Sequence, residues 1–203
     1  MGIDSGYGIG SLKTGVCTTA TRPASPYTGQ AIYDTTVATT LVWSGSAWIA
    51  SGGKVLQVLS TFKSDTFTST STSFADVTSL SVSITPSSAT SKVLVFAQVD
   101  GADDTGVSSG FVRLVRDSTG IDIGDAASSR TRASGQFSSG FNGALGTLTY
   151  VYLDSPATTS ATTYKVQVQT TSGTIYINRS KDDTNNSNYA RGASTITVME
   201  ISA

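Results

Sequence analysis

After residue 54 the chain alternates hydrophobic and polar residues in short runs. Residues 80–84 alternate leucine, valine and isoleucine with serine, and residues 164–169 alternate tyrosine and valine with lysine and glutamine. A period of two places successive side chains on opposite faces of a β-sheet. Strands are therefore predicted at 55–62, 66–70, 80–84, 92–99, 110–116, 135–141, 145–153, 163–169, 174–178 and 194–201.

About ten short strands without a helical period predict an all-β fold, an antiparallel β-sandwich of jelly-roll type. Serine and threonine make up roughly a third of the chain, a composition that favours strands and turns over helices. Hydrophobic residues still account for 38% of the sequence and fall in alternating runs, so we expect a packed core and not disorder.

The residues before 54 have a different pattern. Residues 1–28 are rich in glycine and include R-P-A-S-P at 22–26, which predicts an extended attachment segment without a regular element. Short apolar runs on both sides of a Ser-Gly-Ser turn at 44–46 predict a β-hairpin or small meander within 29–53, closed by a Ser-Gly-Gly joint. The expected domains are 1–28, 29–53 and the sandwich at 54–203.

Charge and targeting signals narrow the possible partners. The chain carries 13 basic and 14 acidic residues, and this balance argues against a nucleic-acid partner. No apolar run is long enough to span a membrane, and the first residues lack a signal-peptide pattern. We therefore expect synthesis in a cytoplasm without membrane insertion. The one cysteine, Cys17, excludes an intrachain disulfide.

The sequence lacks most of the residue combinations that known enzyme sites use. There is no histidine, which removes the common nucleophile–base pairs and the usual zinc ligand sets. Glu200 is the only glutamate, and the aspartate pairs 103/104, 122/125 and 182/183 lie in turn-rich stretches. Residues 182–185 lack the spacing of a calcium loop. We predict no catalytic residue, no metal and no cofactor, and a polysaccharide depolymerase is the weaker alternative.

Three groups of residues remain as candidate sites. Trp43 and Trp48 lie on opposite sides of the hairpin turn, where they either pin the hairpin together with Ile32 and Tyr33 or form a stacking platform for sugars; the first interpretation is favoured. The polar stretches 101–109 and 181–188 predict surface loops. Their host-facing candidates are Asp103, Asp104, Asp182, Asp183 and Asn186.

Residues 21–35, T-R-P-A-S-P-Y-T-G-Q-A-I-Y-D-T, and 41–48, L-V-W-S-G-S-A-W, resemble a hairpin module of tail-fibre and related appendage proteins of tailed phages. Trp43, Gly45 and Trp48 match its W-x-G-x-x-W ending. Residues 80–88, 112–118, 153–159 and 194–201 are similar to a C-terminal sandwich of environmental phage structural proteins. A single hairpin copy without shaft repeats departs from a long fibre.

The resemblance implies a non-enzymatic bacteriophage virion protein, usually a homotrimer, whose N-terminal part binds other virion proteins of the tail or capsid. The expected attachment residues are Tyr7, Leu12, Val16, Arg22 and Pro23. The leading hypothesis is a short trimeric tail fibre or appendage that contacts the host surface, with host glycans as a candidate partner. The alternative is a capsid decoration protein of head-fibre or cement type.

Overall fold

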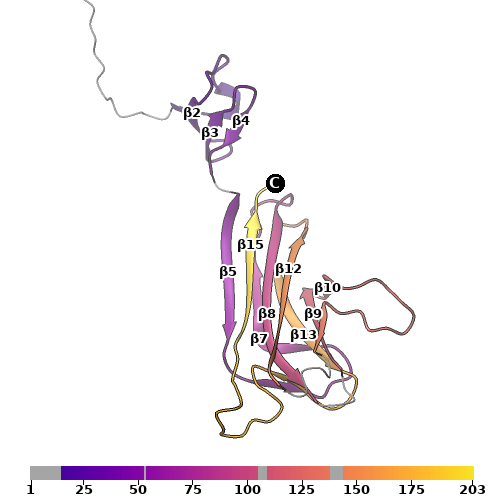
Figure 1. The fold of residues 1–203 in the computed structure, drawn as a ribbon. Helices are drawn as coiled ribbons and strands as arrows, with labels where there is room; N and C mark the ends of the chain where they lie inside the picture. The colour runs from indigo at the N-terminus through magenta and orange to yellow at the C-terminus, as the bar shows by residue number, and fades with distance from the viewer. Residues whose placement is uncertain (1–14, 53, 105–108, 138–143) are drawn as a thin grey trace, which may run out of the picture. The chain divides into compact units, whose positions relative to one another are not determined.

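The computed structural model describes residues 15–52, 54–104, 109–137 and 144–203 (Figure 1). The chain divides into two compact units, residues 1–53 and 54–203, and each is described by itself. Among the described residues, β-strands are the regular elements of both units apart from one turn of 3-10 helix, so the predicted all-β class is confirmed. No helix in the described ranges has the length and apolar character needed to cross a membrane.

The first unit is a four-stranded sheet with a single turn of 3-10 helix. Its elements are β1 (Gly15–Cys17), η1 (Thr19–Thr21), β2 (Ala31–Asp34), β3 (Thr39–Trp43) and β4 (Trp48–Ala50). Strands β2, β3 and β4 form the predicted antiparallel meander, and β1 pairs with β2 in parallel.

The expectation that residues 1–28 contain no regular element is wrong for residues 15–21, which form β1 and η1. In β1, Gly15 lies beside Ile32 and Cys17 lies beside Asp34. This pairing joins segments separated by the whole R-P-A-S-P stretch. Local composition therefore gave no signal for the strand, because its hydrogen-bond partners are supplied by the edge of β2.

The second unit contains two antiparallel sheets that pack face to face. One sheet has the order β10 (Thr119–Ile121), β9 (Gly110–Arg116), β13 (Thr162–Thr170) and β7 (Ala75–Ile84), with β11 (Gly135–Phe137) also paired to β9. The other has the order β5 (Val55–Lys63), β15 (Ser194–Ile201), β8 (Lys92–Asp103), β14 (Ile175–Ile177) and β6 (Phe67–Ser69), with β12 (Gly146–Asp154) also paired to β8. The sandwich is confirmed, whereas a jelly-roll topology stays a prediction.

The core between the sheets follows the predicted alternation. Val93, Val95 and Val99 of β8 are fully buried, and Ile196 and Val198 of β15 lie beside them in the same cluster. Burial of a valine or isoleucine side chain contributes about 1.5 to 3 kcal/mol. Twenty buried hydrophobic side chains lie in this one cluster, so the second unit has a core of its own.

Two strands extend further than predicted, and one was missed. β7 begins at Ala75 and β8 continues to Asp103, while the short β10 was not expected. The prediction of a surface loop at 101–109 is therefore wrong for residues 101–103, which are buried in β8. A Cβ atom on Gly101 would lie 2.5 Å from the Tyr176 carbonyl oxygen. This glycine therefore allows the two strands to pack closely and does not form a turn. The expected strand residues 138–141 lie outside the described residues.

Candidate functional site

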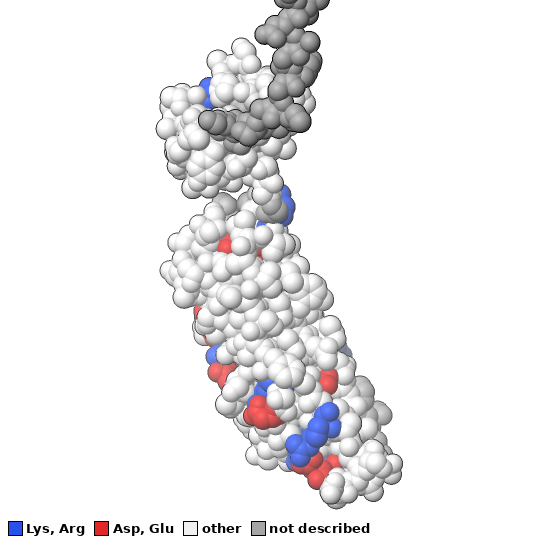
Figure 2. Space-filling model, turned by 90° about the vertical axis from the view of Figure 1, so that its left-hand side faces the viewer, with Lys and Arg blue, Asp and Glu red and all other residues white. Residues whose placement is uncertain are grey.

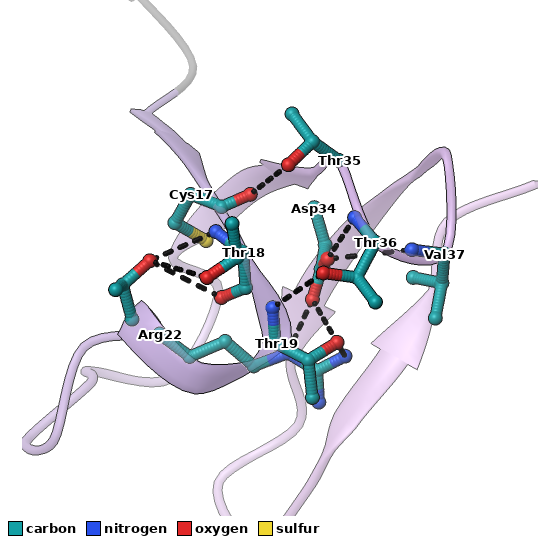
Figure 3. A network of polar contacts seen from close by, with 9 residues as sticks. Cys17, Thr18, Thr19, Arg22, Asp34, Thr35, Thr36 and Val37 are labelled. Atoms are coloured by element: carbon teal, nitrogen blue, oxygen red, sulfur yellow. Dashed lines mark hydrogen bonds and ion pairs between the residues drawn. The ribbon is translucent and has the colours of Figure 1, made fainter.

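The interior of the first unit is organised around the buried carboxylate of Asp34 (Figure 3). Its Oδ2 accepts hydrogen bonds from Arg22 Nε at 2.6 Å and Thr19 Oγ1 at 3.0 Å. Its Oδ1 accepts one from the Thr36 backbone N–H at 2.8 Å and a longer one from Val37. The carboxylate therefore joins the β2–β3 turn to the segment that follows β1.

Burial by itself raises the pKa of Asp34, but the hydrogen bonds from Arg22, Thr36, Thr19 and Val37 outweigh it and lower the pKa below the ordinary value. The carboxylate is thus held ionised beside the guanidinium. Arg22 was expected to contact another virion protein. Its guanidinium pairs with Asp34 of the same unit and the side chain is 25% exposed, so contact with another virion protein stays a prediction.

The predicted hairpin-pinning residues divide between the two sides of the small sheet. Ile32 is buried with Leu41, and Trp43 and Trp48 are half-buried on the same side as a directly opposite cross-strand pair. Their rings meet edge to face, with centroids 5.5 Å apart and planes inclined at 61°. Tyr33 points to the opposite side of β2 and is exposed, so it adds nothing to this core.

The opposite side of the small sheet presents exposed apolar residues. Val16 of β1 lies next to Tyr33 of β2, and Val42 of β3 lies next to Ile49 of β4. Val16 is 71% exposed and Ile49 is 52% exposed. We call these four residues the module face. The charged residues of 15–52 are Arg22 and Asp34, which pair with each other on the other side, so the module face carries no charge.

The remaining attachment candidates are less informative. Tyr7 and Leu12 lie outside the described residues, and Pro23 is half-buried beside Arg22. Of the five candidates, Val16 is the one that the structure brings onto the module face. Sequence reasoning missed Val42 and Ile49, although the alternation along β3 and β4 was the signal that places them on the same side as Tyr33.

A depression of about 880 Å³ in the second unit lies over β9, β10 and β12. Its polar lining includes Arg116, Asp122, Asp154 and Tyr152. Arg116 Nη1 donates to both oxygens of the buried Asp154 carboxylate at 2.8 Å, and the Tyr164 hydroxyl donates to Oδ2 at 2.7 Å. These groups bind one another at the edge of the depression, beside the Tyr152 ring.

The host-facing candidates differ in their surroundings. Asp103 is buried in β8, so its placement in an exposed loop is wrong. Asp104 accepts hydrogen bonds from the Thr174 N–H at 2.6 Å and the Tyr176 hydroxyl at 3.1 Å. Asp183 pairs with Arg191 at 2.7 Å, whereas Asp182 and Asn186 are exposed.

Tyr189 is an exposed aromatic that sequence reasoning did not single out. It lines two neighbouring hollows, of about 270 and 430 Å³, together with Asn186 in the first and Asp182 in the second. The described residues contain no group of three acidic or cysteine side chains placed to hold a metal ion.

No protein-family model and no curated protein matches this chain. Among solved structures, the fold is similar to a chain in the structure of the infectious bursal disease virus Gt strain, with 14% identity and a TM-score of 0.39. The match covers 77% of this chain, which spans only 40% of the length of that one. The function of this chain is therefore inferred from its own residues.

Proposed function

We propose that this chain is a non-catalytic structural subunit of a bacteriophage virion, a short trimeric tail fibre or similar appendage. Its first unit docks onto another virion protein, and its second unit meets the host surface. The observation that carries the proposal is the module face, where Val16, Tyr33 and Ile49 are exposed beside the half-buried Val42 on a unit of this small size. The resemblance of residues 21–48 to the phage hairpin module adds support.

The geometry of the first unit suits docking. The Asp34–Arg22 pair removes its charges from the surface, and the tryptophan pair and Ile32 stabilise the other side of the sheet. The module face is left as an uncharged surface of a sheet whose other side carries these contacts. Apolar residues gathered on one exposed face mark a protein contact in soluble proteins.

The test is incorporation of variant subunits into particles of the parent phage. Ile49→Glu places a charge in the module face at an exposed position, so folding should be retained while incorporation falls at least tenfold. Ser25→Glu adds the same charge at an exposed position of the same unit and is the matched control. Normal incorporation of Ile49→Glu would count against docking through this face.

Host contact is assigned to the second unit. The depression beside Arg116 and Asp154 and the hollows beside Tyr189 offer hydrogen-bonding groups next to aromatic rings, which suits surface glycans. Binding of isolated host glycans by the wild type, weakened in Tyr189→Ala or Arg116→Ala, supports this part of the proposal. Cleavage of the glycan would instead indicate a depolymerase.

In the alternative, the chain is a capsid decoration protein. Its module face would still dock onto the particle, but on the head and not on the tail. A decoration protein needs no receptor, so neither Tyr189→Ala nor Arg116→Ala would change adsorption to host cells. Labelling of intact particles separates the two candidates. Label at the tail supports the appendage, and label distributed over the head supports decoration.

A further inference from the structure

Arg130 and Arg132 differ from the other arginines of the second unit. Both are exposed, and neither forms an ion pair within the described part of the chain. The other arginines of the unit each bind the side chain of an acidic or amide residue; they are Arg113, Arg116, Arg179 and Arg191. Figure 2 shows the β5 side of this unit, where blue and red side chains in the lower part of the view lie next to one another. Arg130 and Arg132 therefore have guanidinium groups that no acidic side chain neutralises.

Both arginines lie in the segment that joins β10 to β11, which leaves the sheet after Ile121 and returns at Gly135 (Figure 1). Hydrogen bonds across its base hold the two arms of the segment together. The Gly124 N–H donates to the Ala133 carbonyl at 3.4 Å, and Arg132 Nε donates to the Gly124 carbonyl at 2.7 Å. The second bond positions the Arg132 guanidinium through Nε, and its two terminal nitrogens still carry N–H groups that can bind a ligand.

This segment and the strands β9 and β11 line a hollow of about 260 Å³. The lining includes Arg130, Arg132, Phe111 of β9 and Gln136 of β11. Phe111 is on the outer side of the sheet, because its neighbour Val112 points into the core. The volume is close to the lower end of the range for ligand pockets, about 300 Å³. The hollow therefore has the size for a single sugar ring.

Phe111 lies between two glutamines at directly opposite positions of the neighbouring strands, Gln136 of β11 and Gln169 of β13. Gln169 Nε2 donates to the Thr72 carbonyl at 2.8 Å, and Gln136 Nε2 donates to the Ser109 hydroxyl at 3.1 Å. These bonds orient both amides and leave each Oε1 as an acceptor. Aromatic rings beside a few oriented polar groups are typical of small-molecule sites, and a sugar uses both kinds of contact.

The charges of the hollow determine which sugar it suits. Two arginines line it against one carboxylate, Asp125, so positive charge is in excess. A guanidinium binds a carboxylate through two parallel hydrogen bonds. Asp125 can accept a hydrogen bond from a sugar hydroxyl, but it repels a phosphate, which carries nearly two negative charges at neutral pH. A sugar with one carboxylate therefore fits this lining better than a neutral or a phosphorylated sugar.

We propose that this hollow binds a carboxylate-bearing sugar of the host surface. Arg130 and Arg132 bind the carboxylate, and the sugar ring lies against Phe111. Gly124 and Ala133 line both this hollow and the 880 Å³ depression described above, so a bound sugar chain can continue from one into the other. The inference rests on the host contact proposed for the second unit and adds to it a further site and the charge of the ligand.

The test is binding of the full chain to glucuronic acid, glucose and glucose 6-phosphate, each coupled through its first carbon to the same carrier protein. The three sugars differ only at the sixth carbon, which is a carboxylate, carries a hydroxyl or carries a phosphate. Biolayer interferometry should show glucuronic acid bound at least tenfold more tightly than glucose, and more tightly than glucose 6-phosphate. Equal binding of glucuronic acid and glucose, tightest binding of the phosphate, or no binding of glucuronic acid would each overturn the inference.

Variants locate the binding. Arg130→Gln removes one charge from the hollow at an exposed position and should weaken binding of glucuronic acid at least fivefold, with strand content unchanged in circular dichroism. Lys54→Gln removes the same charge at an exposed position outside the hollow and should bind like the wild type. Wild-type binding by Arg130→Gln, or an equal loss in Lys54→Gln, would show that the carboxylate is not bound in this hollow.

These outcomes are separate from failure of the proposed function. A chain that binds neutral host glycans through Arg116 or Tyr189 and shows no preference for a carboxylate would overturn the inference alone. Normal incorporation of Ile49→Glu into particles would count against the docking part of the proposed function and would leave the sugar site unaffected.

Discussion

The indole rings of Trp43 and Trp48 lie edge to face across the β3–β4 turn, with their centroids 5.5 Å apart. Each ring is half-buried, so the pair stabilises the hairpin from one side without forming a sealed core. A fully buried tryptophan contributes about 3 to 5 kcal/mol against alanine, and a half-buried pair of this geometry should contribute about 2 kcal/mol.

We therefore expect Trp48→Ala to increase the rate of protease cleavage within residues 15–52 at least tenfold. The melting transition of the second unit should be unchanged, because its core is separate. Trp48→Phe keeps an aromatic edge against Trp43 and should restore most of the protection. If Trp48→Ala resists protease like the wild type yet reduces adsorption to host cells, the ring serves as a sugar platform.

A second prediction concerns the contribution of Asp154 to stability. Its carboxylate is buried and binds both the Arg116 guanidinium and the Tyr164 hydroxyl. Asp154→Ala leaves the partly buried arginine without its partner, so we expect a loss of about 3 kcal/mol in the free energy of unfolding. Tyr164→Phe removes one hydrogen bond and should cost about 1 to 2 kcal/mol. Chemical denaturation measures both, and equal losses would show that the ion pair contributes nothing.

Glu200 should make the second unit sensitive to acid. Burial alone raises its pKa, but hydrogen bonds from Ser87, Gln57 and Ser91 outweigh burial and lower the pKa to about 2 from an ordinary value of 4.5. A folded-state pKa below the unfolded one means that stability is present above pH 4.5 and is lost as the pH falls toward 2. Melting temperatures across this window should fall more steeply in the wild type than in Glu200→Gln. Parallel curves would contradict the assignment.

The pKa of Asp103 shifts in the opposite direction to that of Glu200. Among the described residues, no donor makes a hydrogen bond of normal distance and angle to either of its carboxylate oxygens. Burial raises the pKa of Asp103, and the nearby Asp104 carboxylate adds to the rise, although the amides of Asp103 and Gly110 oppose it. Its contribution to stability is then greatest below the unfolded pKa of 3.8 and is lost as the pH rises through the higher folded pKa.

Asp103→Asn keeps the size of the side chain and removes its charge. The variant should melt at a higher temperature than the wild type at pH 7, with the difference shrinking below pH 4. Asp182→Asn removes a charge at an exposed position and should leave the melting temperature within a degree of the wild type at both pH values. A lower melting temperature for Asp103→Asn at pH 7 would show that the charged form has a stabilising partner.

Alternation along the chain predicted most strands of the sandwich because a half-buried strand repeats every two residues. β9 and β15 have the predicted bounds, and β7 has its predicted C-terminal end. The pattern was weaker where polar residues are buried. The Asp-Gly-Ala-Asp run at 100–103 has the composition of a turn, yet it continues β8 because β12 and β14 pair with it.

The candidate site was predicted less well than the fold. Arg22 and Asp34 are twelve residues apart, and only the folded turn brings the guanidinium to the carboxylate. The two sides of β5 and β12 could not be told apart for a related reason. In β5 and β12 apolar residues occupy both sides of the strand, so the sequence alone does not say which side meets the other sheet.

The most direct test of the whole account is a map of the intact virion at side-chain resolution. The account predicts density for this chain outside the particle, with Val16, Tyr33 and Ile49 against another virion protein. A map in which the module face is turned to solvent, or in which no density fits the chain, would contradict it.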